Sequence, residues 1–237
     1  MFRAELPRAL RYAEALCSVG VQRGLIGPQE TARIWHRHLL SSAALADLLP
    51  AAGTVGDLGS GAGLPGLVVA IVRPQLQVVL VEPMLRRCEF LQACVASLGL
   101  PHVEVLRARA EDLLGGRTFD VALARAVAPL HRLVPLALPL LRPGGRLLAV
   151  KGRGAAAELA AGQAVVRAAG ARARLRTWQP TWAVEPIRVV EVQAPRADTA
   201  VARGHRGTRK RAGRGGRQGG HGEAGRPGLA ERVDPLR

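Results

Sequence analysis

The sequence contains only three cysteines, Cys17, Cys88 and Cys94, and their spacing does not match a set of metal ligands. An odd number also argues against a disulfide framework. Cys88 and Cys94 are six residues apart in a stretch predicted to be helical, so they would lie on different helix faces. We therefore interpret the three cysteines as buried apolar residues of a cytosolic protein, and we expect no metal site.

Long apolar stretches are also missing. No run of about 18 uncharged apolar residues occurs, and the N-terminal segment carries charges at Arg3, Glu5, Arg8, Arg11 and Glu14. Both features argue against a membrane-spanning helix and against the apolar core of a signal peptide. The sequence predicts a soluble cytoplasmic protein without a membrane partner, and we expect a monomer.

Acidic residues are scarce: 18 Asp and Glu face 34 Lys and Arg, which gives a formal net charge of +16. Residues 203–237 hold ten basic and three acidic residues, so +7 of this charge lies there and +9 lies on residues 1–202. A basic excess favours an anionic partner, RNA above all. A GC-rich gene would also produce many arginines, and lysine occurs only twice. The charge alone therefore does not establish nucleic-acid binding.

Apolar periodicity stops after Pro195. Residues 203–237 contain ten glycines and no aromatic residue, so they cannot bury enough surface to offset the entropy of ordering. We predict a disordered Gly/Arg-rich basic tail over residues 196–237.

What the sequence does contain is a glycine-rich stretch at residues 54–66, Thr-Val-Gly-Asp-Leu-Gly-Ser-Gly-Ala-Gly-Leu-Pro-Gly. An apolar approach ends at Asp57, alternate glycines follow, and Pro65 opens an apolar run. This order predicts a buried strand, a tight turn and a helix whose first turn holds Pro65. The glycines allow a ligand to approach closely, and the helix start should offer free N–H groups. The stretch predicts a site for a nucleotide-like cofactor.

Two cofactors fit the glycines in different registers. Gly61-x-Gly63-x-x-Gly66 matches the dinucleotide fingerprint, which would suit an NAD(P)-dependent reductase. However, its first glycine falls three residues after the expected strand end. The register Asp57-x-Gly59-x-Gly61-x-Gly63 instead puts a carboxylate at the strand tip, which would repel a pyrophosphate and suits a cationic ligand such as S-adenosylmethionine.

A second acidic residue supports a nucleoside-containing ligand. Glu82 follows Gly63 by 19 residues, at the expected end of the next strand. A carboxylate about 20 residues after a glycine turn can accept hydrogen bonds from ribose hydroxyls.

From residue 54 onward the sequence alternates strand and helix patterns, which predicts an α/β fold with a parallel sheet covered on both faces. Strands are expected at 54–58, 77–82, 103–108, 119–125, 145–150, 172–178 and 186–192, and helices at 64–72, 84–98, 111–114, 129–141 and 154–169.

Two amphipathic helices are expected before the glycine turn. The first spans residues 4–20, with Leu6, Leu10, Leu16 and Val19 as its apolar side, and the second runs from Pro28 to Leu49. The second carries a basic cluster, most simply a solvated face: Arg33, His36, Arg37 and His38.

Five blocks between residues 15 and 192 resemble, in the right order, the bacterial small-subunit ribosomal RNA methyltransferase G family, also called glucose-inhibited division protein B. The blocks are Asp57-Leu-Gly-Ser-Gly-Ala-Gly-Leu-Pro-Gly66, Val81-Glu-Pro-Met-Leu-Arg-Arg-Cys-Glu-Phe-Leu91, Arg109-Ala-Glu111, Ala124-Arg-Ala-Val-Ala-Pro-Leu130 and Lys151-Gly152.

The resemblance implies a class I S-adenosylmethionine-dependent methyltransferase fold with a seven-stranded, mostly parallel sheet. Residues 1–50 would form a helical extension packed on a cofactor-binding domain at 51–195. The implied reaction is methylation of N7 of a guanine in the 530 loop of 16S ribosomal RNA, with 16S rRNA or the small ribosomal subunit as partner. Arg37-His38-Leu39-Leu40 could then help form the substrate-facing wall.

The resemblance also assigns roles to residues at four strand ends. The turn from Gly59 to Leu64 would hold the methionine part of the cofactor, Glu82 the ribose, and Ala110 and Glu111 the adenine. Arg125 would face both cofactor and RNA as a positioning, catalytic residue, and Lys151 could contact phosphate. The expected cofactor-binding residues are Asp57, Gly59, Gly61, Gly63, Leu64, Glu82, Ala110, Glu111 and Arg125.

Missing motifs narrow the reaction. No Asn/Asp-Pro-Pro-aromatic block, typical of exocyclic amine methylation, occurs in Ala124-Arg-Ala-Val-Ala-Pro129, and no cysteine that could activate a ring carbon follows Cys94. Guanine N7 needs neither, because its in-plane lone pair attacks directly once aligned. A reductase, or a non-catalytic RNA-binding protein on the same scaffold, remains the alternative.

Overall fold

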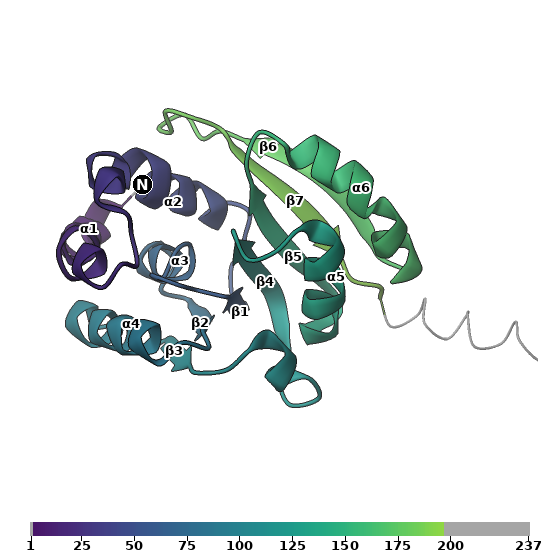
Figure 1. Cartoon of the computed structure of the whole chain (residues 1–237), viewed down its shortest axis with the longest axis horizontal. Helices are drawn as coiled ribbons and strands as arrows, with labels where there is room; N and C mark the ends of the chain where they lie inside the picture. The colour runs from purple at the N-terminus through teal and green to yellow at the C-terminus, as the bar shows by residue number, and fades with distance from the viewer. Residues whose placement is uncertain (1, 197–237) are drawn as a thin grey trace, which may run out of the picture.

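The computed structural model describes residues 2–196, which form a seven-stranded sheet with helices on both faces (Figure 1). The strand order is β3-β2-β1-β4-β5-β7-β6. All neighbours from β3 to β5 pair in parallel, and β7 runs antiparallel to β5 and β6. The strands are β1 Gly53–Leu58, β2 Leu76–Val81, β3 Val103–Leu106, β4 Phe119–Arg125, β5 Leu141–Lys151, β6 Arg172–Trp178 and β7 Ile187–Gln193.

The predicted α/β fold with a seven-stranded, mostly parallel sheet is confirmed. The predicted tail lies outside the described residues, apart from Arg196. Within residues 2–196 no helix is long and apolar enough to cross a bilayer.

Helices lie on both sides of the sheet. On one side are α1 Leu6–Ala15, α2 Ser41–Ala46, α3 Gly66–Val72 and α4 Leu85–Leu98, and on the other are α5 Leu130–Ala137 and α6 Ala155–Ala168 (Figure 1). Val78 and Leu80 of β2 belong to the first of two apolar clusters, and Val79 and Val81 belong to the second. Because successive strand side chains face opposite sides and both sides are covered, the residues of β2 from Val78 to Val81 are all apolar.

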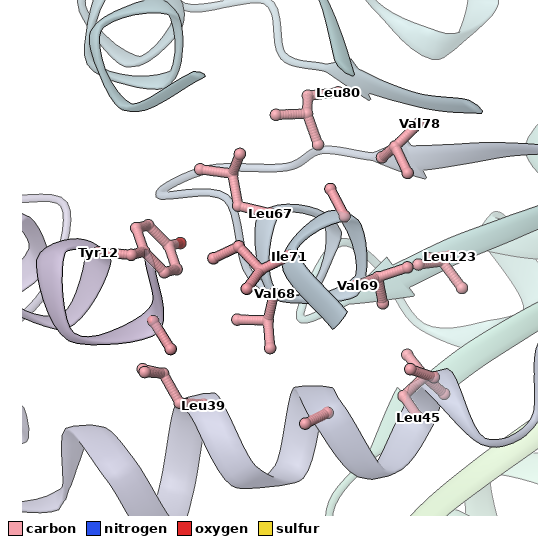
Figure 2. Close-up of a cluster of buried hydrophobic side chains, with 14 of the residues drawn as sticks. Tyr12, Leu39, Leu45, Leu67, Val68, Val69, Ile71, Val78, Leu80 and Leu123 are labelled. Atoms are coloured by element: carbon pink, nitrogen blue, oxygen red, sulfur yellow. The ribbon is translucent and has the colours of Figure 1, made fainter. Parts of the chain in front are cut away.

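Helix α3 is the centre of the first cluster. Leu67, Val68, Val69 and Ile71 are all buried, and Figure 2 shows this helix between the sheet and the N-terminal helices, which contribute Tyr12, Leu39 and Leu45. Residues 2–50 therefore pack directly on the helix that follows the glycine turn.

The N-terminal segment is helical but irregular. In place of one helix over residues 4–20, the chain forms a 3₁₀ turn at Arg3–Glu5, α1, and a π-helical stretch at Leu16–Gly20. The predicted second helix is divided into a 3₁₀ stretch at Pro28–Arg33, a π-helical stretch at Ile34–Leu40, and α2. Such π-helical stretches occur frequently at functional sites.

The apolar side predicted for the first helix is partly wrong. Leu6 and Leu10 are exposed, whereas Ala9, Tyr12 and Ala13 are buried. The small alanines let α1 approach its neighbours closely, and the hydroxyl of Tyr12 has a partner inside, the carbonyl oxygen of Ala62 at 2.8 Å. A buried tyrosine commonly satisfies its hydroxyl in this way.

The predicted helix over residues 129–141 is too long. Helix α5 ends at Ala137, a 3₁₀ turn covers Leu138–Leu140, and β5 starts at Leu141. Pro139 follows the end of α5, and proline has no backbone N–H to continue the helical hydrogen bonds.

Glu191 of β7 is buried, and its carboxylate contacts three arginines from the two neighbouring strands, β5 and β6. Its carboxylate lies 3.1 Å from Nη1 of Arg146, 2.9 Å from Nε of Arg174 and 3.3 Å from Nη1 of Arg176. Burial would raise the pKa of Glu191, but the hydrogen bonds from Arg174 and Arg146 outweigh it and hold the pKa below its usual value.

Glu191→Gln is expected to lower the free energy of unfolding by about 1.5–3 kcal/mol, because it removes charge-assisted hydrogen bonds from a buried acceptor. Since the pKa is lowered by folding, this contribution is present above the unfolded pKa of about 4.3 and is lost as pH falls through the folded pKa. Urea unfolding at pH 7 tests the effect. Glu104→Gln, at an exposed pair with Arg117, is the control and should cost about 1 kcal/mol or less.

Candidate cofactor and substrate site

The strand order reverses between β1 and β4. After β1 the chain moves outward through β2 and β3, then returns to the other side of β1 as β4. Ligands of open α/β sheets bind at the carboxyl ends of the strands at such a switch point. In the register, Leu58 of β1 pairs with Val81 of β2 and with Ala124 of β4.

The next residue of each strand therefore lies at the same edge of the sheet. These residues are Gly59, Glu82 and Arg125, three of the predicted site residues. Strand pairing thus aligns a backbone turn, a carboxylate and a guanidinium that are far apart in the sequence.

The glycine turn adopts the left-handed conformation that its sequence predicts. Gly59, Gly61 and Gly63 have φ of 68°, 62° and 96°, values that favour glycine strongly. A Cβ at Gly63 would lie 2.8 Å from the hydroxyl oxygen of Tyr12. At Gly61 a Cβ would meet only the carbonyl oxygen of Gly59, at 3.9 Å. A ligand therefore has room to approach the backbone of Gly61.

The expectation of free N–H groups at the helix start is wrong for Gly66 and Leu67, whose amides donate to Asp57 and to the carbonyl oxygen of Gly63. Six amides of the segment are used inside the protein: Gly59 and Ser60 donate to Val81, Gly61 to Glu82, Gly63 and Leu64 to Ser60, and Gly66 to Asp57. The carboxylates of Asp57 and Glu82 accept two of these hydrogen bonds and backbone carbonyl groups accept the other four, so these six amides are not available to an anion.

With its amides occupied, the turn presents mainly hydrogen-bond acceptors to a ligand. Among the described residues, the carbonyl groups of Gly59 and Gly61 accept no hydrogen bond. The carboxylates of Asp57 and Glu82 are each 1% exposed and accept hydrogen bonds from Ser60 and Gly61 of the same turn. Carbonyl oxygens and carboxylates attract a cationic ligand and disfavour a pyrophosphate.

Glu82 joins the ends of two strands. Its Oε2 accepts a hydrogen bond from the amide of Gly61 at 2.9 Å, and its Oε1 accepts one from the amide of Met84 at 3.0 Å. The guanidinium of Arg87 lies 3.5 Å from Oε2. Each carboxylate oxygen has two lone pairs, so acceptor capacity remains for hydroxyl donors.

Asp57 faces inward. Its Oδ2 accepts hydrogen bonds from the hydroxyl of Ser60 at 2.7 Å and from the amide of Gly66 at 3.0 Å, so it ties the turn to the start of α3. Burial raises the pKa of this carboxyl to about 6, although both hydrogen bonds oppose the shift.

Asp57→Asn is expected to keep both hydrogen bonds, because the amide oxygen can accept them, and to remove the cost of the buried charge. Folding raises the pKa from about 3.9 to about 6. Wild-type stability should therefore fall as pH rises through this window and stay lower above it. The melting temperature of Asp57→Asn at pH 8 should equal or exceed that of the wild type.

Asp57→Ala leaves both donors unsatisfied and should cost about 2–4 kcal/mol. Thermal melts of both variants at pH 5 and pH 8 measure the contrast. A substantially lower melting temperature for Asp57→Asn at pH 8 would contradict this interpretation of the carboxyl.

The residues expected to hold an adenine lie after β3. Ala110 begins a 3₁₀ turn, Ala110–Leu113, and is buried in the same apolar cluster as Leu58 and Val81, which precede the glycine turn and Glu82. Glu111 is exposed, and Leu64 is half-buried in the glycine turn. Ala110 thus shares an apolar cluster with the residues that precede two of the strand ends. Hydrogen bonds to the glycine segment come from Asp57 and Glu82.

A groove of about 1090 Å³ opens beside the turn. The segment from Arg125 to Pro129 lines this groove, and we call it the floor of the groove. The floor adjoins the glycine turn, because Val127 would lie 3.0 Å from a Cβ at Gly59. Ala126, also in the floor, has a φ of 56°, which is strained for a residue with a side chain. Six basic side chains and two acidic ones line the groove: Arg33, Arg37, Arg125, Lys151, Arg153, Arg188, Glu158 and Glu185.

Lys151 is held by its own chain. Its Nζ donates to the carbonyl oxygen of Ala128 at 2.9 Å and lies 2.7 Å from Oε1 of Glu158. Glu158 also accepts a hydrogen bond from the amide of Leu130 at 2.7 Å. The lysine that was expected to contact phosphate therefore braces the floor of the groove.

Two of the basic groove residues, Arg153 and Arg188, were not anticipated. Arg153 lies just beyond the end of β5, and Arg188 of β7 pairs with Lys151 across the antiparallel ladder. A basic residue after a strand end was a visible signal for Arg153. The sequence around Arg188 holds no such signal, because Arg188 reaches the groove only through the pairing of β7 with β5. Within the described part of the chain, no group of three or more His, Cys, Asp or Glu residues could hold a metal ion.

Comparison with known proteins agrees with this geometry. The family model of rRNA small subunit methyltransferase G matches residues 5–176. A protein of Frankia casuarinae named ribosomal RNA small subunit methyltransferase G is 46% identical over 222 residues, covering 87% of this chain and 80% of its own length. A protein of the same name from a Nocardioides species is 58% identical over 156 residues, but the match spans only 62% of that relative and 66% of this chain.

Solved structures support the fold. TYW2 of Pyrococcus horikoshii, crystallised in complex with MeSAdo, superposes with a TM-score of 0.53 at 13% identity, over 66% of this chain and 62% of its own. The precorrin-6y C5,15-methyltransferase of Geobacter metallireducens superposes with a TM-score of 0.51 at 12% identity, over 72% of this chain and 90% of its own. The sheet and its helices are those of class I methyltransferases.

Proposed function

Because the chain belongs to the rRNA small subunit methyltransferase G family, we propose that it transfers the methyl group of S-adenosylmethionine to N7 of a guanine in the 530 loop of 16S ribosomal RNA. We expect it to act in the cytoplasm, as a monomer, on 16S rRNA or the small ribosomal subunit. The expected cofactor site comprises the glycine turn with Leu64, the carboxylates of Asp57 and Glu82, the pair Ala110 and Glu111, and Arg125.

The residues present fit this cofactor. The open backbone at Gly61 leaves room for the methionine part of S-adenosylmethionine, and the unpaired carbonyls of Gly59 and Gly61 suit its ammonium group. The remaining lone pairs of Glu82 suit ribose hydroxyls. When bound, the cofactor supplies an electrophilic methyl group on a positively charged sulfur.

The observation that carries the proposal is the basic groove that adjoins this turn. Arg33 and Arg37 come from the N-terminal extension, and Arg125 comes from β4. Arg153 follows the end of β5, and Arg188 belongs to β7. Such a distribution suits RNA phosphates on both sides of an inserted nucleotide. The cofactor turn and the groove share the segment Arg125–Pro129, so a nucleotide in the groove would lie beside the methyl donor.

The chain's own residues have little covalent chemistry to perform. Guanine N7 carries a free in-plane lone pair, so no side chain must remove a proton before attack. Alignment of acceptor and donor supplies most of the acceleration. Arg125 stays charged at neutral pH, which casts it as a residue that orients RNA or the cofactor carboxylate. Lys151 and Glu158 hold the floor that carries it.

The closure of the turn argues against the reductase alternative. A pyrophosphate would need the amides that Asp57, Glu82 and Val81 already occupy, and it would face two buried carboxylates. A non-catalytic RNA-binding protein would have no use for a turn shaped for close approach at Gly61. Its distinguishing property would be RNA binding without methyl transfer.

The test is transfer of labelled methyl from S-adenosylmethionine to 16S rRNA and to small subunits from cells that lack the gene, with mass spectrometry of the modified nucleotide. We expect one 7-methylguanosine in the 530 loop. Label on another nucleotide would overturn the target assignment, and RNA binding without label would favour the non-catalytic protein. Titration with NADH, in parallel, tests the reductase directly.

A further inference from the structure

The guanidinium of Arg125 is held from behind by the N-terminal extension. Its Nη2 lies 3.0 Å from Nδ1 of His38 and 3.2 Å from the carbonyl oxygen of Arg37. The other ring nitrogen of His38, Nε2, lies 2.8 Å from Oε2 of Glu30. A continuous chain of polar contacts thus runs from the 3₁₀ stretch Pro28–Arg33, through the π-helical stretch Ile34–Leu40, to the end of β4.

These contacts fix the protonation of the imidazole. A guanidinium can only donate, so Nδ1 of His38 must be the acceptor, and the single proton of the neutral ring then sits on Nε2 and is donated to Glu30. Burial lowers the pKa of His38, and this outweighs the opposing hydrogen bond to Glu30. The charged groups that face the ring are Glu30, Arg37 and Arg125, and the two cations lower its pKa further.

Neither Glu30 nor His38 lines the groove, whereas Arg37 and Arg125 do. The side chain of His38 is 13% exposed. Glu30 also lies 3.3 Å from Nη1 of Arg37. The carboxylate of Glu30 therefore contacts two groove arginines, Arg37 directly and Arg125 through the imidazole of His38. We expect Glu30 and His38 to affect a bound ligand through these arginines.

We propose that Glu30 and His38 are positioning residues that hold the Arg125 guanidinium in its productive orientation, an inference that rests on the methyl-transfer function proposed above. Within residues 2–196, Nη2 of Arg125 has one partner besides the imidazole, the carbonyl oxygen of Arg37. Without the imidazole, the flexible arginine side chain would therefore sample more rotamers. With it, the guanidinium is directed before RNA arrives. Turnover should depend on this arrangement more than cofactor affinity does.

Protonation of His38 should undo the arrangement. A proton on Nδ1 removes the acceptor for Arg125 and sets two cations against each other. Because the pKa of His38 lies below its usual value of 6.5, the wild type should keep full turnover at pH 7 and lose it as pH falls well below 6.5.

The experiment compares the wild type with His38→Leu, His38→Asn, Glu30→Ala and Glu30→Gln. For each, kcat and KM for S-adenosylmethionine and for 16S rRNA are measured between pH 5 and pH 9, with melting temperatures. His38→Leu should lower kcat about tenfold, as expected for loss of one charge-assisted hydrogen bond. His38→Asn, whose Oδ1 can replace Nδ1, should recover most of kcat and lack the acidic limb of the pH profile. Glu30→Ala should lower kcat a few-fold, and Glu30→Gln should have a kcat close to that of the wild type.

His131→Asn is the matched control, because His131 is exposed on α5 and lies outside the groove; its kcat should equal that of the wild type. Unchanged kcat in His38→Leu would overturn the proposal. So would equal losses in His38→Leu and His38→Asn together with lowered melting temperatures, since this is the result of a purely structural role. If the wild type itself transfers no methyl group, the proposed function fails, which is a different outcome from a wild type that is active and indifferent to His38.

Discussion

Gly61→Val is expected to abolish detectable binding of S-adenosylmethionine in isothermal titration while leaving a folded protein. The position has a φ of 62°, which a β-branched residue resists, so we expect a loss of about 1–3 kcal/mol of stability. A Cβ there would lie no closer than 3.9 Å to its one neighbour, the carbonyl oxygen of Gly59, so we expect backbone strain to be the main cost. The branched side chain would fill the space that the ligand needs.

Gly99→Val separates the two effects. Gly99 ends helix α4 with a φ of 63° and has nothing within 4 Å of a Cβ, so it repeats the backbone strain in equally open space away from the glycine turn. It should lose similar stability and bind S-adenosylmethionine as the wild type does. Equal affinities in Gly61→Val and the wild type would show that the cofactor lies elsewhere.

Features that depend on local chemistry could be predicted from the sequence. The predicted bounds of β4 and β6 agree with the structure at both ends. β4 is a mostly apolar run, and β6 alternates arginines with Ala173, Leu175 and Thr177, which is the period of a strand. The tight turn followed from the alternate glycines after Asp57. The strand order required the family resemblance in addition, since alternation alone does not say which strands are neighbours.

Features that depend on tertiary contacts could not be predicted. The sequence gives no sign that Tyr12 would be buried and Leu10 exposed, because both suit a helical apolar stripe, and the choice rests on the partner at Ala62. The occupied amides of the turn depend on where the carboxylates of Asp57 and Glu82 point. The link from Glu30 to Arg125 joins residues that only the folded chain brings together.

Glu82→Gln and Arg125→Ala should impair the enzyme in different ways. A glutamine has one acceptor oxygen where Glu82 uses both, toward Gly61 and Met84. It therefore loosens the turn and loses a charge-assisted acceptor for ribose hydroxyls, worth about 1.5–3 kcal/mol, or about 10- to 150-fold in affinity. The ribose is remote from the transferred methyl group, so its binding is equal in ground and transition states. KM for S-adenosylmethionine should rise, with kcat at saturation little changed.

Arg125→Ala should instead lower kcat by at least about tenfold even at saturating cofactor, because misalignment of the guanine is not repaired by more ligand. The protein should stay folded, since Arg125 ends β4 at the rim of the groove and its partners there are a ring nitrogen and a carbonyl group. Steady-state kinetics with both substrates varied, alongside thermal melts, distinguish the two variants. Arg117→Ala, which removes an exposed arginine paired with Glu104 far from the groove, controls for the loss of charge alone. If Arg125→Ala turns over like Arg117→Ala while Glu82→Gln binds the cofactor as tightly as the wild type, the aligned strand ends of β1, β2 and β4 are not the site of methyl transfer.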